Sequence, residues 1–195
     1  MISYFKNVGV EMNNKIIVFS GKQLSGKDCI AKLLLAYLPD FRRIGIGDAI
    51  KLEYMEHTGL SLEEIDKNKA IYRADLIELG QRRRAEDKDY WLKKVIDLPY
   101  NILVPDMRMQ RELEMLRSAN AFTIRVNSTI EARQARGPLS KVDDVTETEL
   151  DSVVGWDYVI ENNGTLEDLK AEVSKLYEYL QEHYLQDDIP YSQFV

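Results

Sequence analysis

The sequence has very little of what disulfide-bonded and zinc-binding proteins need. Cys29 is its only cysteine, so no internal disulfide forms, and its two histidines, His57 and His183, are too far apart for a zinc-ligand spacing. We therefore expect a protein of a reducing compartment. Because a free cysteine is more often buried than reactive, Cys29 is predicted to pack in the interior.

Positive charge and long apolar runs are also scarce. The chain carries 26 Lys and Arg against 33 Asp and Glu, and a net charge of −7 argues against a general nucleic-acid binder. No apolar run approaches the length of a membrane span, and residues 1–14 lack the pattern of a secretion signal. We expect a cytoplasmic protein without nucleic-acid or membrane partners. Residues 1–14 are interpreted as an N-terminal extension, with the start left open between Met1 and Met12.

The most informative segment is an apolar run over residues 15–20 that leads directly into a glycine-containing loop. This loop reads Gly21-Lys22-Gln23-Leu24-Ser25-Gly26-Lys27-Asp28. It fits the phosphate-binding pattern G-x-x-x-x-G-K-[ST] except at the last position, where a carboxylate replaces the hydroxyl that ligates Mg²⁺. A carboxylate is itself a suitable Mg²⁺ ligand. A plain turn before a helix would need one glycine and no lysine, so we predict a nucleotide-phosphate site.

Strand-like and helix-like segments alternate along the rest of the chain. The expected strands cover residues 15–20, 41–46, 101–104, 121–126 and 158–160. This alternation predicts one α/β domain over residues 15–185, built on a five-stranded, mostly parallel, doubly wound sheet. An acidic tail over residues 186–195 follows it.

Two further segments carry predictions. Residues 128–139 contain Arg133 and Arg136 and end at Gly137-Pro138, which suits a small mobile lid over about 128–145. The last helix has an apolar stripe, and packing onto the sheet is favoured over a dimer seam because only about two heptads exist. The protein is therefore expected to be a monomer or a homodimer.

Polar residues follow every expected strand, at the edge of the sheet where ligands collect in open α/β folds. They are Lys22, Lys27, Asp28, Asp48, Lys51, Asp106, Arg108, Arg133, Arg136, Asn162, Asn163 and Gly164. A helical region adds Lys69, Arg73, Arg82, Arg83 and Arg84, which suit an acceptor's phosphate. Phosphoryl transfer needs mainly positioning and positive charge, and both are present here. The alternatives are helix caps for Asp48 and Asp106 and a solvated helix surface for the three consecutive arginines.

With these residues in place, the chain resembles the animal-type phosphomevalonate kinases, a nucleoside-monophosphate-kinase-like branch of phosphate-loop proteins. The resemblance covers about residues 15–180 in order. It rests on the GKxxSGKD loop and on the segments 69–75 with Gly80 and Arg83-Arg84, 106–108, 133–137, 142–144 and 156–162.

The resemblance implies a three-layer α/β/α P-loop fold and transfer of the γ-phosphoryl group of ATP to mevalonate 5-phosphate, with Mg²⁺ as cofactor. Catalytic roles are implied for Lys27, Asp106, Arg133 and Arg136. Nucleotide contacts are implied for Gly21, Ser25, Gly26, Lys27, Asp28, Cys29, Asn162 and Gly164, with Asp28 as the metal ligand. Acceptor contacts are implied for Lys22, Asp48, Lys69, Arg73, Arg84 and Arg108.

Two alternatives stay open. Gln23, Leu24 and Met109 stand where the resembled family tends to have basic residues, and deoxynucleoside monophosphate kinases share the SGKD loop, the Asp-x-Arg after a strand and the Asn-Gly before the last helix. A nucleotide-binding switch without transfer is the other alternative. The segment Asn68-Lys69-Ala70-Ile71 fails the fourth position of a guanine-reading motif, which argues against such a switch.

Overall fold

The computed structural model of the chain describes residues 14–140 and 144–186. Its centre is a parallel sheet of five strands in the order β2-β3-β1-β4-β5. The strands are β1 (Ile16–Gly21), β2 (Arg42–Arg43), β3 (Ile102–Met107), β4 (Phe122–Asn127) and β5 (Tyr158–Glu161). This confirms the predicted doubly wound α/β sheet. The domain boundaries at 15 and 185 stay a prediction, and the expected tail after residue 186 lies outside the described residues.

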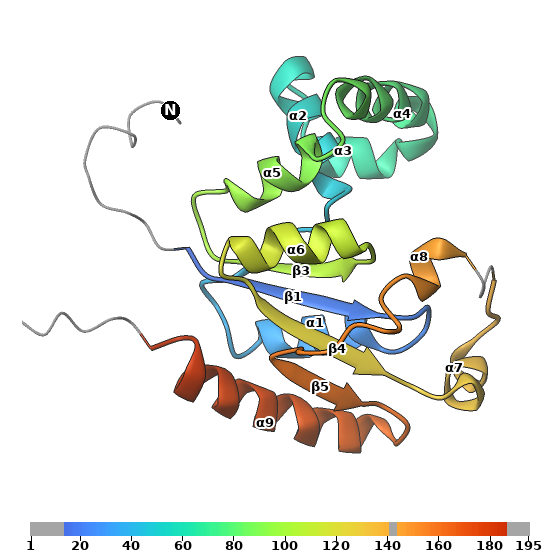
Figure 1. Cartoon of the computed structure of the whole chain (residues 1–195). Helices are drawn as coiled ribbons and strands as arrows, with labels where there is room; N and C mark the ends of the chain where they lie inside the picture. Colours follow the sequence, from blue (N-terminus) through green and yellow to red (C-terminus); the bar gives the residue numbers. More distant parts are fainter. Residues whose placement is uncertain (1–13, 141–143, 187–195) are drawn as a thin grey trace, which may run out of the picture.

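Helices cover both faces of the sheet (Figure 1). On one face lie α1 (Lys27–Leu35) and α9 (Leu166–His183), and on the other lie α5 (Tyr90–Ile96) and α6 (Gln110–Ser118). Side chains alternate along β1, so Ile17 and Phe19 pack toward α1 and α9 while Ile16 and Val18 pack toward α5 and α6. The fully buried central strand fixes where the phosphate loop leaves the sheet.

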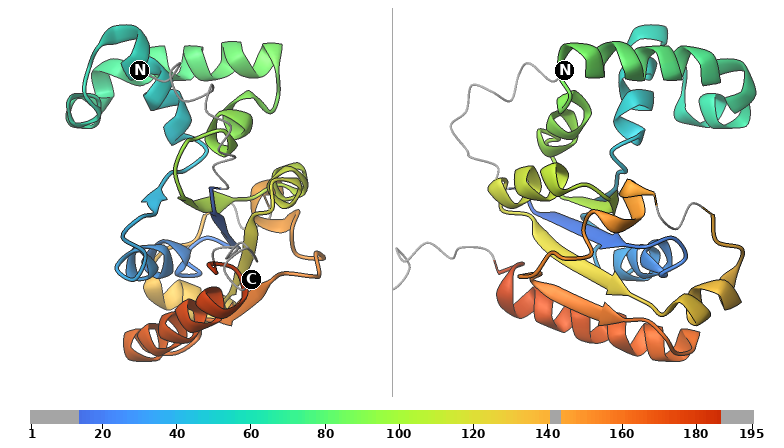
Figure 2. Two further views of the ribbon diagram at one scale, coloured as in Figure 1. Left: turned by 90° about the vertical axis from the view of Figure 1, so that its left-hand side faces the viewer. Right: turned by 45° about the vertical axis from the view of Figure 1, so that its right-hand side comes forward.

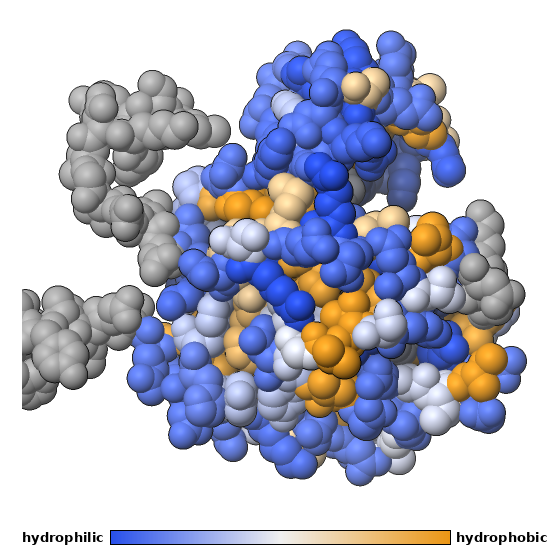
Figure 3. Space-filling model, in the orientation of Figure 1, coloured by the Kyte–Doolittle hydropathy of each residue, from blue (hydrophilic) through white to orange (hydrophobic). Residues whose placement is uncertain are grey.

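A separate group of helices projects beyond the sheet on the side of α5 (Figure 2). It consists of α2 (Asp48–Thr58), α3 (Leu62–Lys67) and α4 (Lys69–Glu86). Ser61 caps α3 by accepting a hydrogen bond from the Glu64 N–H at 3.2 Å, as the capping-box pattern predicts. The surface of this group is mainly hydrophilic in the view of Figure 3. Two short helices, α7 (Ile130–Arg136) and α8 (Val145–Thr148), lie beyond the ends of the strands.

Three expectations about local structure are wrong. The third strand does not end at Pro105 but runs on to Met107, because β2 has only two residues and pairs with Ile102 and Leu103, so no neighbour on that side needs a proline N–H. Cys29 is exposed, because the buried face of α1 is made by residues at helical spacing that leave it outside. The second strand covers only Arg42–Arg43 and not the expected residues 41–46. The segment before β5, for which no element was expected, contains the short helix α8, capped by Asp144.

The last helix packs onto the sheet as predicted, with Leu169, Val173, Leu176 and Leu180 buried. Leu166, at the start of the predicted stripe, is 49% exposed. None of the described helices combines the length and the apolar character that crossing a membrane requires.

Candidate active site

The loop between β1 and α1 has the geometry of an anion cradle. Gly26 lies in the left-handed region with φ of 98°, and α1 begins at Lys27, so the N–H groups of its first turn point toward the loop. A Cβ on Gly21 would come within 2.6 Å of the Val126 carbonyl oxygen, so only glycine fits there. The Ser25 hydroxyl is buried and has no hydrogen-bond partner among the described residues. The backbone of the loop is therefore compatible with the predicted phosphate site.

Lys27 folds back over this loop. Its Nζ donates to the Lys22 carbonyl at 3.4 Å, and the residue is only 5% exposed. Burial lowers the pKa of Lys27, and the nearby positive charge of Arg108 lowers it further. A buried ammonium held by one long hydrogen bond is well placed to gain from a bound phosphate.

The side chain of Asn162 contacts the backbone of the phosphate loop. Its side-chain amide donates to the Ser25 carbonyl at 2.8 Å, and a Cβ on Gly26 would lie 2.2 Å from that same nitrogen. The Asn162 side chain is thus committed to the loop backbone. Gly164 leaves room for Asp168, which forms a capping box with Thr165 at the start of α9. Their predicted nucleotide contacts stay a prediction.

Arg136 and Arg133 reach the same loop from α7. The lid predicted over about 128–145 stays a prediction, and its residues 141–143 lie outside the described residues. Arg136 donates to the Leu24 carbonyl at 3.1 Å and to the Asn162 carbonyl at 2.8 Å. Arg133 is 6% exposed and donates to the Gln23 carbonyl at 3.4 Å, and its Nε finds no hydrogen-bond acceptor in the described part of the chain. The predicted flap therefore brings two positive charges to the rim of the phosphate loop.

The carboxylates of Asp28 and Asp48 both lie near one positive side chain, that of Arg43. The guanidinium of Arg43 lies 3.2 Å from the Asp28 carboxylate and 3.8 Å from the Asp48 carboxylate. Within residues 14–140 and 144–186, no three His, Cys, Asp or Glu side chains gather closely enough to hold a metal by themselves. That is compatible with Mg²⁺, which binds proteins through one or two carboxylates and completes its shell with phosphates and water. Asp28 fits this role.

Asp106 and Asp48 flank the same region. Asp106 accepts from the Ile46 N–H at 3.2 Å, and burial raises the pKa of its carboxyl, with a further rise from the charge of Asp48. Asp48 accepts from the Gly45 N–H at 2.9 Å. Neither side chain is a helix N-cap, which was the alternative interpretation. Gly47 is the N-cap residue of α2, and Asp106 lies within β3.

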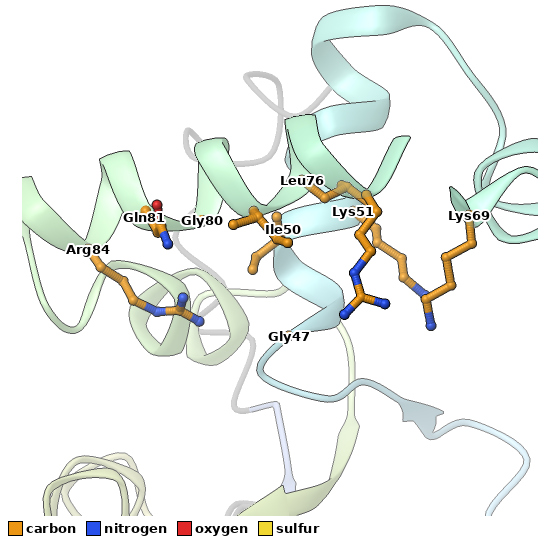
Figure 4. Close-up of a pocket in the computed structure, with 10 residues that line it drawn as sticks. Gly47, Ile50, Lys51, Lys69, Leu76, Gly80, Gln81 and Arg84 are labelled. Atoms are coloured by element: carbon orange, nitrogen blue, oxygen red, sulfur yellow. The ribbon is translucent and has the colours of Figure 1, made fainter. Parts of the chain in front are cut away.

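A pocket of about 380 Å³ lies between α2 and α4. It is lined by Gly47, Ile50, Lys51, Lys69, Arg73, Leu76, Ile77, Gly80, Gln81 and Arg84. Figure 4 shows Arg84 at one end and Lys51 and Lys69 at the other, with Ile50 and Gly80 between them. Three of the predicted acceptor residues, Lys69, Arg73 and Arg84, thus line one pocket with an apolar middle.

The three consecutive arginines of α4 point to different partners. Arg84 lines this pocket, whereas Arg82 lines a separate hollow beside Tyr54 and Asp75. Arg83 donates to the buried Glu53 at 2.8 Å, so it fixes α4 onto α2. Only one of the three therefore faces the candidate acceptor pocket, a distinction that the sequence alone did not make.

Two further predicted acceptor residues, Lys22 and Arg108, pair with carboxylates of the segment around α8. Lys22 Nζ lies 2.6 Å from Asp151, and Arg108 Nη1 lies 2.5 Å from Glu147. Asp151 also pairs with the nearly buried Arg125 at 3.0 Å. Lys22, Arg125 and Asp151 line a second cavity of about 460 Å³. Arg43, Arg125, Glu147 and Asp151 were not predicted as site residues from the sequence. The only signal was the acidic stretch before β5, which is more often a solvated surface.

Residues 19–122 match the family model described as phosphomevalonate kinase, and this match spans more than half of the chain. The chain belongs to the phosphomevalonate kinase family. A second family model, described as deoxynucleotide monophosphate kinase, matches residues 84–173. Both descriptions are of kinases, so this phosphomevalonate kinase family member is an ATP-dependent small-molecule kinase.

Solved structures add the fold. Shikimate kinase from Acinetobacter baumannii, in complex with shikimate, superposes with a TM-score of 0.51 at 15% identity, covering 89% of this chain and 96% of that chain. Shikimate kinase from Bacteroides thetaiotaomicron gives 0.49 at 14% identity over 86% and 98% of the two chains. APS kinase from Mycobacterium tuberculosis, in complex with AMPPNP and APS, gives 0.47 at 14% identity over the same shares. The first of these confirms the predicted kinase-type α/β fold.

Proposed function

We propose that this protein is a phosphomevalonate kinase, which converts mevalonate 5-phosphate and ATP into mevalonate 5-diphosphate and ADP. The observation that carries the proposal is the pocket between α2 and α4, with positive side chains at both ends and an apolar middle (Figure 4). Mevalonate 5-phosphate has a phosphate at one end, a carboxylate at the other and a branched carbon chain between. Charge and shape are therefore complementary.

In the proposed reaction an oxygen of the acceptor phosphate attacks the γ-phosphorus of ATP, and the bond to the bridging oxygen breaks so that ADP leaves with the electron pair. The loop amides and Lys27 hold the nucleotide phosphates, and Arg133 and Arg136 stabilise charge on the transferred group. Asp28 would hold Mg²⁺, which would neutralise charge on the phosphates. Lys69, Arg73 and Arg84 position the acceptor. Asp106, whose charge acts on Lys27, is the proposed catalytic carboxylate.

A deoxynucleotide is the second candidate acceptor, and the match of residues 84–173 to the deoxynucleotide monophosphate kinase model favours it. Against it, the ten described residues that line the pocket include no aromatic side chain on which a base would stack. Under either proposal the protein acts on a small phosphate ester in the cytoplasm, as a monomer or homodimer, without a nucleic-acid or membrane partner.

A thermal-shift comparison separates the two acceptors. The protein is heated with a non-hydrolysable ATP analogue and with mevalonate 5-phosphate, dTMP, dGMP or dCMP in turn. We expect mevalonate 5-phosphate alone to raise the melting temperature further, since a ligand stabilises the state that binds it. If dTMP, dGMP or dCMP raises the melting temperature and mevalonate 5-phosphate does not, the protein is instead a deoxynucleotide kinase.

A further inference from the structure

Both carboxylate oxygens of Glu147 contact groups at the phosphate loop or beside it. One oxygen accepts from the Gln23 N–H at 2.6 Å, and the other lies 2.5 Å from Nη1 of Arg108. The Glu147 side chain is only 9% exposed. It comes from α8, so it is separated from the loop by 124 positions in sequence.

The donors that Glu147 uses are the kind that bind phosphate. A backbone N–H of a phosphate loop and an arginine after a sheet strand both favour oxyanions, and a carboxylate satisfies them in the same way as two phosphate oxygens. The charge of Glu147 also acts on Lys27, the lysine of the loop. Glu147 therefore has the contacts of a bound anion.

A phosphate and this carboxylate cannot share those contacts. The Gln23 N–H can donate well to only one oxygen, and two anions a few ångströms apart in a largely buried place repel each other. Other carboxylates of the same segment bind elsewhere: Asp151 pairs with Lys22, and Glu149 accepts from the Gln110 N–H at 2.8 Å. Only a rearrangement of Glu147 opens this position to a substrate oxygen.

We propose that the Gln23 N–H and Arg108 form a binding position for a phosphate oxygen, and that Glu147 is an internal competitor for it, which makes Glu147 a specificity-determining residue. A substrate must carry enough negative charge to displace the carboxylate, so the site rejects weakly charged esters. The inference rests on the proposed kinase function only in naming a substrate phosphate as the displacing group.

Binding of simple anions tests this without turnover. Inorganic phosphate and pyrophosphate are titrated by calorimetry into the wild type, Glu147→Gln and Glu147→Ala, with Glu149→Gln as the matched control on the same segment. Circular dichroism and melting curves establish that each variant is folded. We expect both Glu147 variants to bind pyrophosphate about tenfold more tightly than the wild type, because each variant lacks the carboxylate charge that competes for the position. Glu149→Gln should bind pyrophosphate with the affinity of the wild type.

Unchanged or weaker pyrophosphate binding in both folded Glu147 variants would overturn the proposal, because Glu147 would then only hold the loop and Arg108 in position. Steady-state kinetics identify the displacing group: a lower KM for the acceptor alone assigns the position to the acceptor phosphate, and a lower KM for ATP alone assigns it to the γ-phosphate. Tighter anion binding by an enzyme without kinase turnover would support the competitor while refuting the proposed function, so the two failures are distinguishable.

Discussion

The buried carboxylate of Glu53 offers a sharp test of how the pocket between α2 and α4 is held together. Its side chain is 2% exposed and accepts from Arg83 at 2.8 Å, from Tyr90 at 2.6 Å and from Lys94 at 2.9 Å. These contacts tie α2, which carries Ile50 and Lys51 of the pocket, to α4 and α5. Loss of the charge should therefore loosen one wall of the pocket.

The size of the effect follows from the pKa of Glu53. Burial alone would raise it, but the hydrogen bonds from Tyr90, Lys94 and Arg83 outweigh burial and lower the pKa from 4.5 to about 2. That difference corresponds to about 3 kcal/mol of stabilisation of the charged form in the folded state. Since the folded pKa is depressed, this stabilisation is fully present above pH 4.5 and is lost as the pH falls toward 2.

Chemical denaturation of Glu53→Gln against the wild type, between pH 7 and pH 3, measures this contribution. We expect the free energy of unfolding of the variant to be about 3 kcal/mol smaller than that of the wild type at pH 7. The difference should shrink as the pH falls below 4.5, because the wild type then loses the stabilisation from charged Glu53. Glu56→Gln is the control, because Glu56 also pairs with Lys94 but is 55% exposed. Equal stability of wild type and Glu53→Gln at pH 7, or a difference that does not depend on pH, would refute this reasoning.

The remaining predictions concern turnover and binding. Lys27→Ala should abolish turnover and weaken MgATP binding in a calorimetric titration, and binding at wild-type affinity would exclude Lys27 from the nucleotide site. Arg136→Ala should lower kcat by about 10³-fold or more with a smaller effect on the Kd of ATP, and near-normal kcat would remove the lid arginine from the mechanism. Arg73→Ala should raise the KM for the acceptor and leave the KM for ATP unchanged, with Arg82→Ala as the matched control outside the pocket. Gly26→Ala should destabilise the loop by about 1–2 kcal/mol from its left-handed backbone alone, which a melting curve would detect.

Local signals in the sequence predicted the elements well. The phosphate loop is specified by a few adjacent residues, and the structure has it between β1 and α1. The five expected strands are also present, although β2 is shorter than expected. The gathering of polar residues at the strand ends follows from the parallel sheet. These features were predictable because neighbouring residues alone determine them.

Long-range contacts were not predictable in this way. Glu147 looked like one charge among many in an acidic stretch, and only the packing of α8 against the loop brings it to Gln23 and Arg108. Arg83 and Arg84 are adjacent in sequence, and it is the buried Glu53 that turns one of them away from the pocket. The direction of a charged side chain depends on partners that sequence spacing does not reveal.

The most direct test of the central claim is ADP release by the purified chain at saturating MgATP, measured by a coupled assay with and without mevalonate 5-phosphate. Phosphoryl transfer to this acceptor predicts one ADP formed for each mevalonate 5-diphosphate, and almost no ADP release without the acceptor. An equal rate of ADP release in the presence and absence of mevalonate 5-phosphate would contradict it.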